Sequence, residues 1–111
     1  MKSYFYQATI SAVLRAEIIQ DVGHFQNAMR ASVEAFGGRV IRCQLSAAGA
    51  DPIGFLEFPD EVAASAWTTS YVSREGVLTS SIQRLLDEKD LQRLNNLVNA
   101  TGAGTTAGPR R

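Results

Sequence analysis

The segment from Gly49 to Asp60 contains, in this order, a turn, a short apolar run and the start of a helix. Its middle, residues 53–58, is too short for a helix and lies between turn residues in front and Pro59-Asp60 behind. Proline cannot donate to a sheet ladder and aspartate is a favoured helix N-cap, so the chain must pass from strand to helix here. We therefore predict a central β-strand over Ile53–Phe58, around which the other elements must be arranged.

Hydrophobic periodicity predicts the other elements. Alternating apolar and polar residues indicate strands, and apolar residues spaced by three and four indicate helices. The pair Gly37-Gly38 ends the first long helix, because glycine adopts the left-handed backbone conformation at a helix end without strain. We predict strands over Tyr4–Ile10, Arg39–Ser46 and Val77–Arg84, helices over Asp21–Phe36 and Glu61–Ser73, a hairpin loop over Ala47–Pro52, and a last helix that begins at Asp87.

The segment Ser11–Gln20 gives a mixed signal. It contains several helix formers, but the β-branched pair Ile18-Ile19 and the following Gly23 weaken a continuous helix. We expect a helical turn or an ordered loop there.

The C-terminal residues differ in composition from the rest of the chain. Residues 101–111 contain no large apolar side chain that could offset the entropy lost on ordering, roughly 1–2 kcal/mol per residue. We therefore expect one domain over residues 1–98 and a flexible C-terminal tail over residues 99–111.

The order of elements predicts an α+β fold of the ferredoxin-like βαββαβ type, with a four-stranded antiparallel sheet and an extra C-terminal helix. Right-handed crossovers place the first and third strands in the middle and both main helices on one face. The helix-covered face is predicted to carry Tyr4, Tyr6, Ala8, Ile41, Cys43, Leu45, Gly54, Leu56, Phe58, Leu78 and Ile82. The open face is predicted to carry Phe5, Gln7, Thr9, Val40, Arg42, Gln44, Ile53, Phe55, Glu57, Val77, Thr79 and Ser81.

The open face is too apolar to remain in water. Phe5, Val40, Ile53, Phe55 and Val77 would form an exposed patch larger than soluble monomers usually keep. A second copy of the chain would bury this face in a symmetric interface. We therefore expect a homodimer, or a higher oligomer built from dimers.

Composition argues against several classes of function. The chain has 11 basic and 11 acidic residues, so nothing in its charge favours a nucleic-acid partner. No apolar run approaches the roughly 20 residues that span a bilayer, and no signal-like segment is visible, so we expect no membrane partner and a cytoplasmic location. A single cysteine, Cys43, and a single histidine, His24, exclude an internal disulfide and a Cys/His zinc site within one chain. We expect neither a metal nor a cofactor.

Four short motifs carry a resemblance to a known family. They are Phe36-Gly37-Gly38-Arg39-Val40, Gly49-Ala50-Asp51, Glu57-Phe58-Pro59-Asp60 and Leu78-Thr79-Ser80-Ser81-Ile82. With these motifs the chain, from roughly Tyr4 to Leu94, resembles the GYD-domain family, small bacterial proteins of unassigned function. Ala50 stands where the family pattern has tyrosine. The resemblance implies a ferredoxin-like fold of the dimeric α/β-barrel type, and it brings no catalytic residues.

The open face also carries the candidate ligand site. Its residues combine polar groups, one carboxylate and an aromatic wall, a composition typical of small polar-ligand pockets. Arg42 and Glu57 could act there as an electrophile and an acid, or they could form a cross-strand ion pair, which is routine in sheets. We expect both to face an enclosed space, with Glu57 across from Phe5. The predicted ligand-binding residues are Gln7, Arg42, Phe55, Glu57 and Thr79.

The remaining reactive side chains fit structural roles. His24 could reach a strand end as a base, but no nucleophile motif accompanies it, and a surface or interface histidine fits better. Cys43 falls on the helix-covered face and is expected to be an inert core thiol. Two functions remain: a non-catalytic assembly or small-ligand-binding module, and a small cofactor-free enzyme with a pocket between sheet and helices, the latter by analogy of fold alone.

Overall fold

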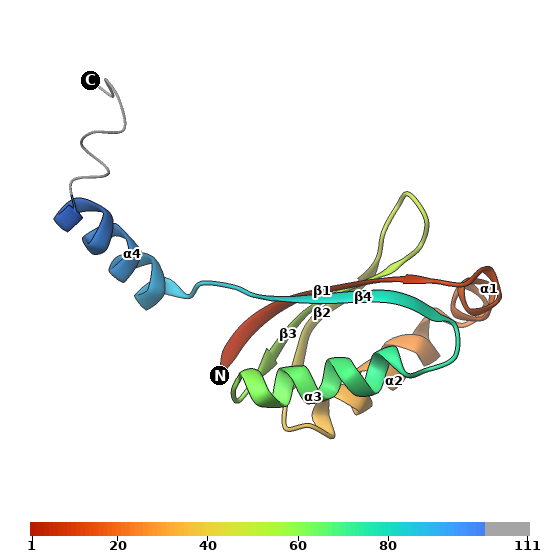
Figure 1. The fold of residues 1–111 in the computed structure, drawn as a ribbon. Coiled ribbons are helices and arrows are strands. Elements are labelled where there is room, and N and C mark those ends of the chain that lie inside the picture. The colour runs from red at the N-terminus through yellow and green to blue at the C-terminus, as the bar shows by residue number, and fades with distance from the viewer. Residues whose placement is uncertain (102–111) are drawn as a thin grey trace.

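A computed structural model describes residues 1–101 and shows an open sheet with two long helices packed against one face (Figure 1). The fold is α+β and ferredoxin-like, as predicted, with one helix added after the first strand and one at the C-terminal end. The elements are β1 (Lys2–Ile10), α1 (Ala12–Gln20), α2 (Val22–Glu34), β2 (Arg39–Leu45), β3 (Pro52–Phe58), α3 (Glu61–Val72), β4 (Val77–Arg84) and α4 (Glu88–Thr101).

The four strands form one antiparallel sheet in the order β2-β3-β1-β4. The predicted central position of the first and third strands is confirmed. In the pairing of the two central strands Phe5 lies opposite Phe55 and Tyr4 opposite Leu56. Because side chains alternate across a strand, the aromatic pair and the Tyr4–Leu56 pair face opposite sides of the sheet.

The hydrophobic core lies between the sheet and the helices α2 and α3. Trp67 of α3, 1% exposed, is its largest fully buried side chain, and its ring centroid lies 4.7 Å from that of Tyr6 on β1. The indole Nε1–H donates a hydrogen bond to Ser32 Oγ on α2 (3.1 Å), so Trp67 also joins the two helices. The buried core residues are Tyr4, Tyr6, Ala8, Ile10, Ile18, Phe25, Met29, Val33, Leu56, Phe58, Ala64, Trp67 and Tyr71.

The segment after β1 is a nine-residue helix, α1, so the expected helical turn or loop underestimates its helical content. Ser11 caps it, because its hydroxyl oxygen accepts a hydrogen bond from the backbone N–H of Leu14 (3.2 Å). Ile18, which weakens the helix by propensity, is 6% exposed and packs in the core. Tertiary burial therefore outweighs local propensity here.

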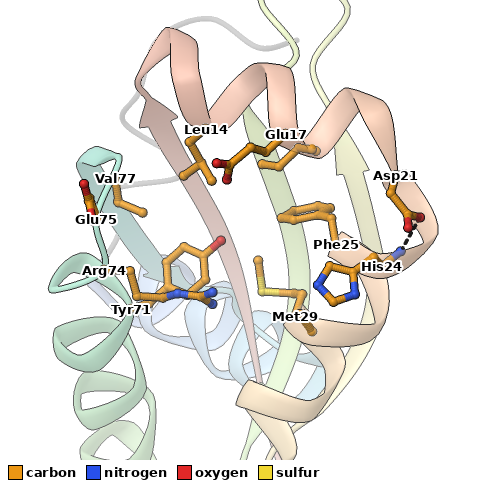
Figure 2. Close-up of a pocket in the computed structure, with 12 residues that line it drawn as sticks. Leu14, Glu17, Asp21, His24, Phe25, Met29, Tyr71, Arg74, Glu75 and Val77 are labelled. Atoms are coloured by element: carbon orange, nitrogen blue, oxygen red, sulfur yellow. Dashed lines mark hydrogen bonds between the residues drawn. The ribbon is translucent and has the colours of Figure 1, made fainter.

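Asp21 separates α1 from α2 and is the N-cap of α2. Its Oδ1 accepts a hydrogen bond from the backbone N–H of His24 (3.0 Å; Figure 2). At the other end of α2, Gly37 adopts the left-handed conformation, with φ of 77°, as the glycine pair predicted.

Two edge-strand irregularities overturn part of the predicted face assignment. The β2–β3 register shifts between Val40 and Arg42, so Val40 packs against the core and Ile41 is 51% exposed. The β1–β4 register shifts between Thr9 and Ile10, and correspondingly Val77 packs against the core while Leu78 is 64% exposed. An extra residue in a strand reverses the alternation beyond it, which is why the strictly alternating assignment failed at these positions.

Helix α3 buries one stripe of residues against the sheet. Ala64, Trp67 and Tyr71 are its buried residues, whereas Ala66 and Ser70 are exposed.

Helix α4 projects from the end of β4, away from the sheet and the other helices (Figure 1). Asp87 caps it by accepting a hydrogen bond from the backbone N–H of Asp90 (2.8 Å), and Arg84 of β4 pairs with Asp90 (2.8 Å). It has no buried residue and continues to Thr101, three residues past the domain boundary predicted at residue 98. Residues 102–111 of the predicted tail lie outside the described part of the chain.

Candidate functional site

The open face of the sheet presents an aromatic pair at its centre. Phe5 of β1 and Phe55 of β3 are both partly buried, and their ring centroids lie 5.3 Å apart at an interplanar angle of 53°. Ile53 shares this face, and no helix within residues 1–101 lies over it (Figure 1). Aromatic pairs at such distances contribute roughly 0.5–1.5 kcal/mol beyond the area they bury.

The two charged residues predicted to pair on this face have other partners. The Arg42 guanidinium lies over the Phe55 ring, 5.4 Å from its centroid, whereas Glu57 Oε1 receives hydrogen bonds from Nη2 (2.6 Å) and Nε (3.1 Å) of Arg39. The register explains this difference, since Arg39 lies opposite Glu57 and Arg42 opposite Phe55. A cross-strand ion pair therefore forms at Glu57, as one of the two alternatives predicted, but its partner is Arg39.

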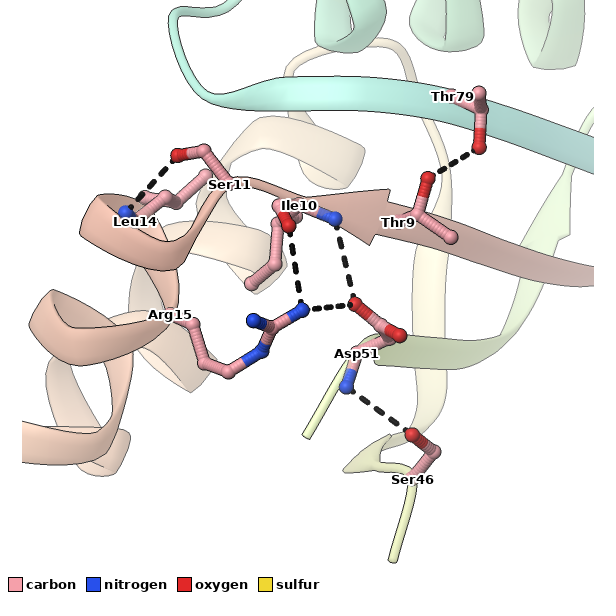
Figure 3. Close-up of polar contacts among 8 residues, drawn as sticks. All are labelled: Thr9, Ile10, Ser11, Leu14, Arg15, Ser46, Asp51 and Thr79. Atoms are coloured by element: carbon pink, nitrogen blue, oxygen red, sulfur yellow. Dashed lines mark hydrogen bonds and ion pairs between the residues drawn. The ribbon is translucent and has the colours of Figure 1, made fainter. Parts of the chain in front are cut away.

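Gln7 and Thr79, unlike the other predicted ligand residues, line a groove of about 360 Å³ beside the β2–β3 hairpin, which we call the hairpin groove. The hydroxyls of Thr9 and Thr79 share a hydrogen bond across β1 and β4 at this groove (Figure 3). The residues that line the groove are Gln7, Ala8, Thr9, Ser46, Asp51, Pro52, Ile53, Thr79, Ser80 and Ser81.

The predicted site therefore divides into two parts. Phe5 lies opposite Phe55, and Ser3 lies opposite Glu57, so the expected placement of Glu57 across from Phe5 was wrong by one layer. The structure brings Arg42 and Phe55 into contact. Glu57 is instead hydrogen-bonded to Arg39, and Gln7 and Thr79 line the hairpin groove.

Asp51 connects the hairpin loop to the end of β1 and to α1 (Figure 3). Its Oδ1 accepts hydrogen bonds from the backbone N–H of Ile10 (3.3 Å) and from Arg15 Nη2 (3.2 Å), which also donates to the Ile10 carbonyl oxygen (3.3 Å). Its own backbone N–H donates to Ser46 Oγ (3.1 Å). Sequence reasoning assigned Asp51 no role, and the only signal was its place in the Gly49-Ala50-Asp51 motif.

A second cavity lies on the opposite, helix-covered side of the molecule (Figure 2). This helix-side pocket has a volume of about 160 Å³ and lies among α1, α2, the end of α3 and the turn into β4. His24, exposed in the first turn of α2, is part of its rim. The surface position predicted for His24 is thus confirmed, and its place beside a cavity is new.

Cys43 packs against the core from the helix-covered face, as predicted. Burial raises the pKa of its thiol above the ordinary value, although the positive charge of Arg30 opposes this shift. A thiol with a raised pKa is mostly protonated at neutral pH and is a weak nucleophile.

Neither metal binding nor membrane insertion gains support from residues 1–101. Within that range no three His, Cys, Asp or Glu side chains gather in an arrangement that could hold a metal ion. No helix in the same range has both the length and the apolar content needed to cross a bilayer.

Comparison with known proteins identifies no family for this chain. No protein-family model matches the sequence, and no curated protein matches it. The function is therefore inferred from the geometry of the open face and of the two cavities.

Proposed function

We propose that the chain is a cytoplasmic homodimeric assembly module in which the open faces of two sheets pack against each other, as the GYD-domain resemblance implies for dimeric α/β barrels. The observation that carries this proposal is the Phe5–Phe55 pair, which lies on the two central strands at the middle of a face that no helix of residues 1–101 covers. Uncovered apolar patches on soluble domains are typically interaction surfaces.

The chemistry of the face suits a protein interface. Aromatic residues and arginine are enriched at the cores of such interfaces, and here Arg42 stacks on Phe55 beside Phe5. The Glu57 carboxylate is already paired with Arg39, so burial of this face would not leave it without a partner.

A second copy of the same chain is the partner that these features favour. The face is centred on a pair of antiparallel strands, and a two-fold axis through the Phe5–Phe55 pair would place identical aromatic surfaces against each other. The chain has 11 basic and 11 acidic residues, so two copies carry no net charge that would repel them.

The non-catalytic alternative fits the geometry better than the enzyme alternative. An acid at work in an enclosed site would have to line a cavity, whereas Glu57 lines neither the hairpin groove nor the helix-side pocket. Ligand binding by Gln7, Arg42, Phe55, Glu57 and Thr79 stays a prediction, now with two separate positions in place of one.

Substitution of Phe55 by aspartate tests the proposed interface. An unpaired charge in a desolvated interface should weaken self-association at least about tenfold. Val62→Asp is the matched control, because Val62 is 78% exposed in the first turn of α3, where an acidic residue is tolerated. Sedimentation velocity should show dimers for the wild type and for Val62→Asp, and monomers for Phe55→Asp at low concentration.

Two outcomes would argue against the interface. One is a monomeric wild type at micromolar concentration, and the other is a Phe55→Asp variant that dimerises as well as the control. Circular dichroism shows whether Phe55→Asp still folds, and Phe55→Ala, which introduces no charge, should weaken the dimer in the same direction.

A further inference from the structure

The helix-side pocket combines an apolar floor with a charged rim (Figure 2). Phe25 and Met29 of α2, Ile18 of α1 and Tyr71 of α3 are all buried and form its inner wall. Its volume, about 160 Å³, is close to that of the engineered apolar cavity of about 150 Å³ that binds benzene. The pocket therefore has room for one six-membered ring with a short substituent.

The rim carries more negative than positive charge. Glu17, Asp21 and Glu75 lie around the opening, and Arg74 is the only lysine or arginine among the residues that line the pocket. Within residues 1–101 neither Glu17 nor Glu75 forms an ion pair, whereas Asp21 is used as the N-cap of α2. Two carboxylates thus remain available to an incoming cation.

The positive charge of Arg74 does not cancel the excess of negative charge on the rim. Its guanidinium lies over the Tyr71 ring, 5.4 Å from the centroid, and so covers one wall of the pocket. The Tyr71 hydroxyl points into the space between α1 and α2 (Figure 2), where it can offer a hydrogen bond to a polar group of a ligand. The imidazole ring of His24 lies on the opposite rim.

We propose that the helix-side pocket binds a small aromatic amine, with the ring against Phe25 and Met29 and the protonated amine at Glu17. The apolar floor accounts for the ring, and the free carboxylate of Glu17 accounts for the positive charge. The pocket is formed within one chain, so this proposal does not depend on the proposed dimer.

Benzylamine is the probe, and benzyl alcohol and benzoate are its neutral and anionic counterparts of similar size. Backbone NMR titrations of the full chain should show benzylamine shifting residues of α1, α2 and the α3–β4 turn. Benzylamine should bind about 1.4- to 5-fold more tightly than benzyl alcohol, since an exposed ion pair contributes roughly 0.2–1 kcal/mol. Benzoate should bind most weakly of the three.

Glu17→Gln should remove most of the preference for the amine without affecting the fold, because Glu17 is exposed. Glu34→Gln, an exposed residue at the other end of α2, is the matched control and should leave the preference unchanged. Ala28→Phe should fill the pocket and weaken all three ligands. If this variant does not fold, the Glu17 and Glu34 pair still decides the question.

Three results would overturn the proposal. They are shifts that fall outside the helix-side pocket, equal or tighter binding of benzyl alcohol or benzoate, and a preference for benzylamine that survives Glu17→Gln. Because the helix-side pocket is formed within one chain and lies away from the open face, a failure here would not count against the proposed dimer, and a failure of the dimer would not count against the pocket.

Discussion

Phe5 lies directly opposite Phe55 in the pairing of β1 with β3, and the two rings contact each other on the open face with centroids 5.3 Å apart. This contact joins the two central strands at the middle of a surface that the helices leave uncovered. Its position gives the face a centre around which two copies can be related by a two-fold axis.

Two glycine-to-alanine substitutions should have opposite effects on stability. A Cβ at Gly38 would lie 2.6 Å from the Glu57 carbonyl oxygen and 2.7 Å from the Phe58 ring, so Gly38→Ala should lower the free energy of unfolding by about 1–3 kcal/mol. A Cβ at Gly23, in the first turn of α2, would meet nothing closer than 3.7 Å, so Gly23→Ala should raise it by up to about 1 kcal/mol. Urea denaturation measures both. If both substitutions changed the unfolding free energy in the same direction, the close contact of Gly38 with Glu57 and Phe58 of β3 would be contradicted.

Loss of the Asp51 carboxylate should cost more than loss of the arginine that pairs with it. Asp51→Ala leaves the Ile10 N–H without its acceptor and should cost about 1–3 kcal/mol of unfolding free energy. Arg15→Met removes only a partly exposed ion pair and should cost less than about 1 kcal/mol. Equal losses in chemical denaturation would mean that the Asp51–Arg15 pair, and not the backbone hydrogen bond, holds the hairpin loop to β1.

Ala50 has a left-handed backbone, with φ of 53°, in the loop before Asp51. Alanine adopts this conformation at a cost of roughly 1–2 kcal/mol that glycine avoids. Ala50→Gly should therefore stabilise the protein by about 1 kcal/mol, whereas Ala50→Val should destabilise it. Thermal unfolding of the two variants tests this, and a lower melting temperature for Ala50→Gly would contradict it.

Alkaline pH should destabilise the fold through its buried tyrosines. Burial raises the pKa of Tyr71 from 10.0 to about 12, although the charge of Arg74 opposes the shift, and burial raises the pKa of Tyr6 as well. The folded state then holds these protons more tightly than the unfolded state, so the stabilisation is complete below about pH 10 and is lost as the pH rises toward 12. Unfolding free energy measured from pH 9 to 11.5 should fall, and it should fall less steeply in Tyr71→Phe. An equal slope in the variant would show that Tyr71 is not the group responsible.

The central strands and the core could be predicted from the sequence because their patterns are strong. The buried alternation from Tyr4 to Ile10 and the spacing of Phe25, Met29 and Val33 each point to one face of one element, and the structure places them there. Trp67 could be recognised as an anchor because few other positions in a small domain accommodate so large a side chain.

The edge strands could not be predicted in the same way. One extra residue at Ile41 moves Val40 into the core, and nothing in the composition of this segment shows that a strand is irregular. The ion pair at the candidate site could not be predicted either, since the partner of Glu57 depends on the register of β2 against β3. The helix-side pocket was missed because it draws on α1, a segment whose helix is stabilised by the burial of Ile18 and not by local propensity.

The central claim is that the open faces of two copies meet, and isotope-filtered NOE spectroscopy on a mixture of labelled and unlabelled chains tests it most directly. Packed sheets lie about 10 Å apart, so their facing side chains are in contact. We predict intermolecular NOEs between the rings of Phe5 and Phe55 in one copy and the Phe55 ring and Ile53 methyl groups in the other. Intermolecular NOEs confined to the leucines of α4, or their complete absence, would contradict it.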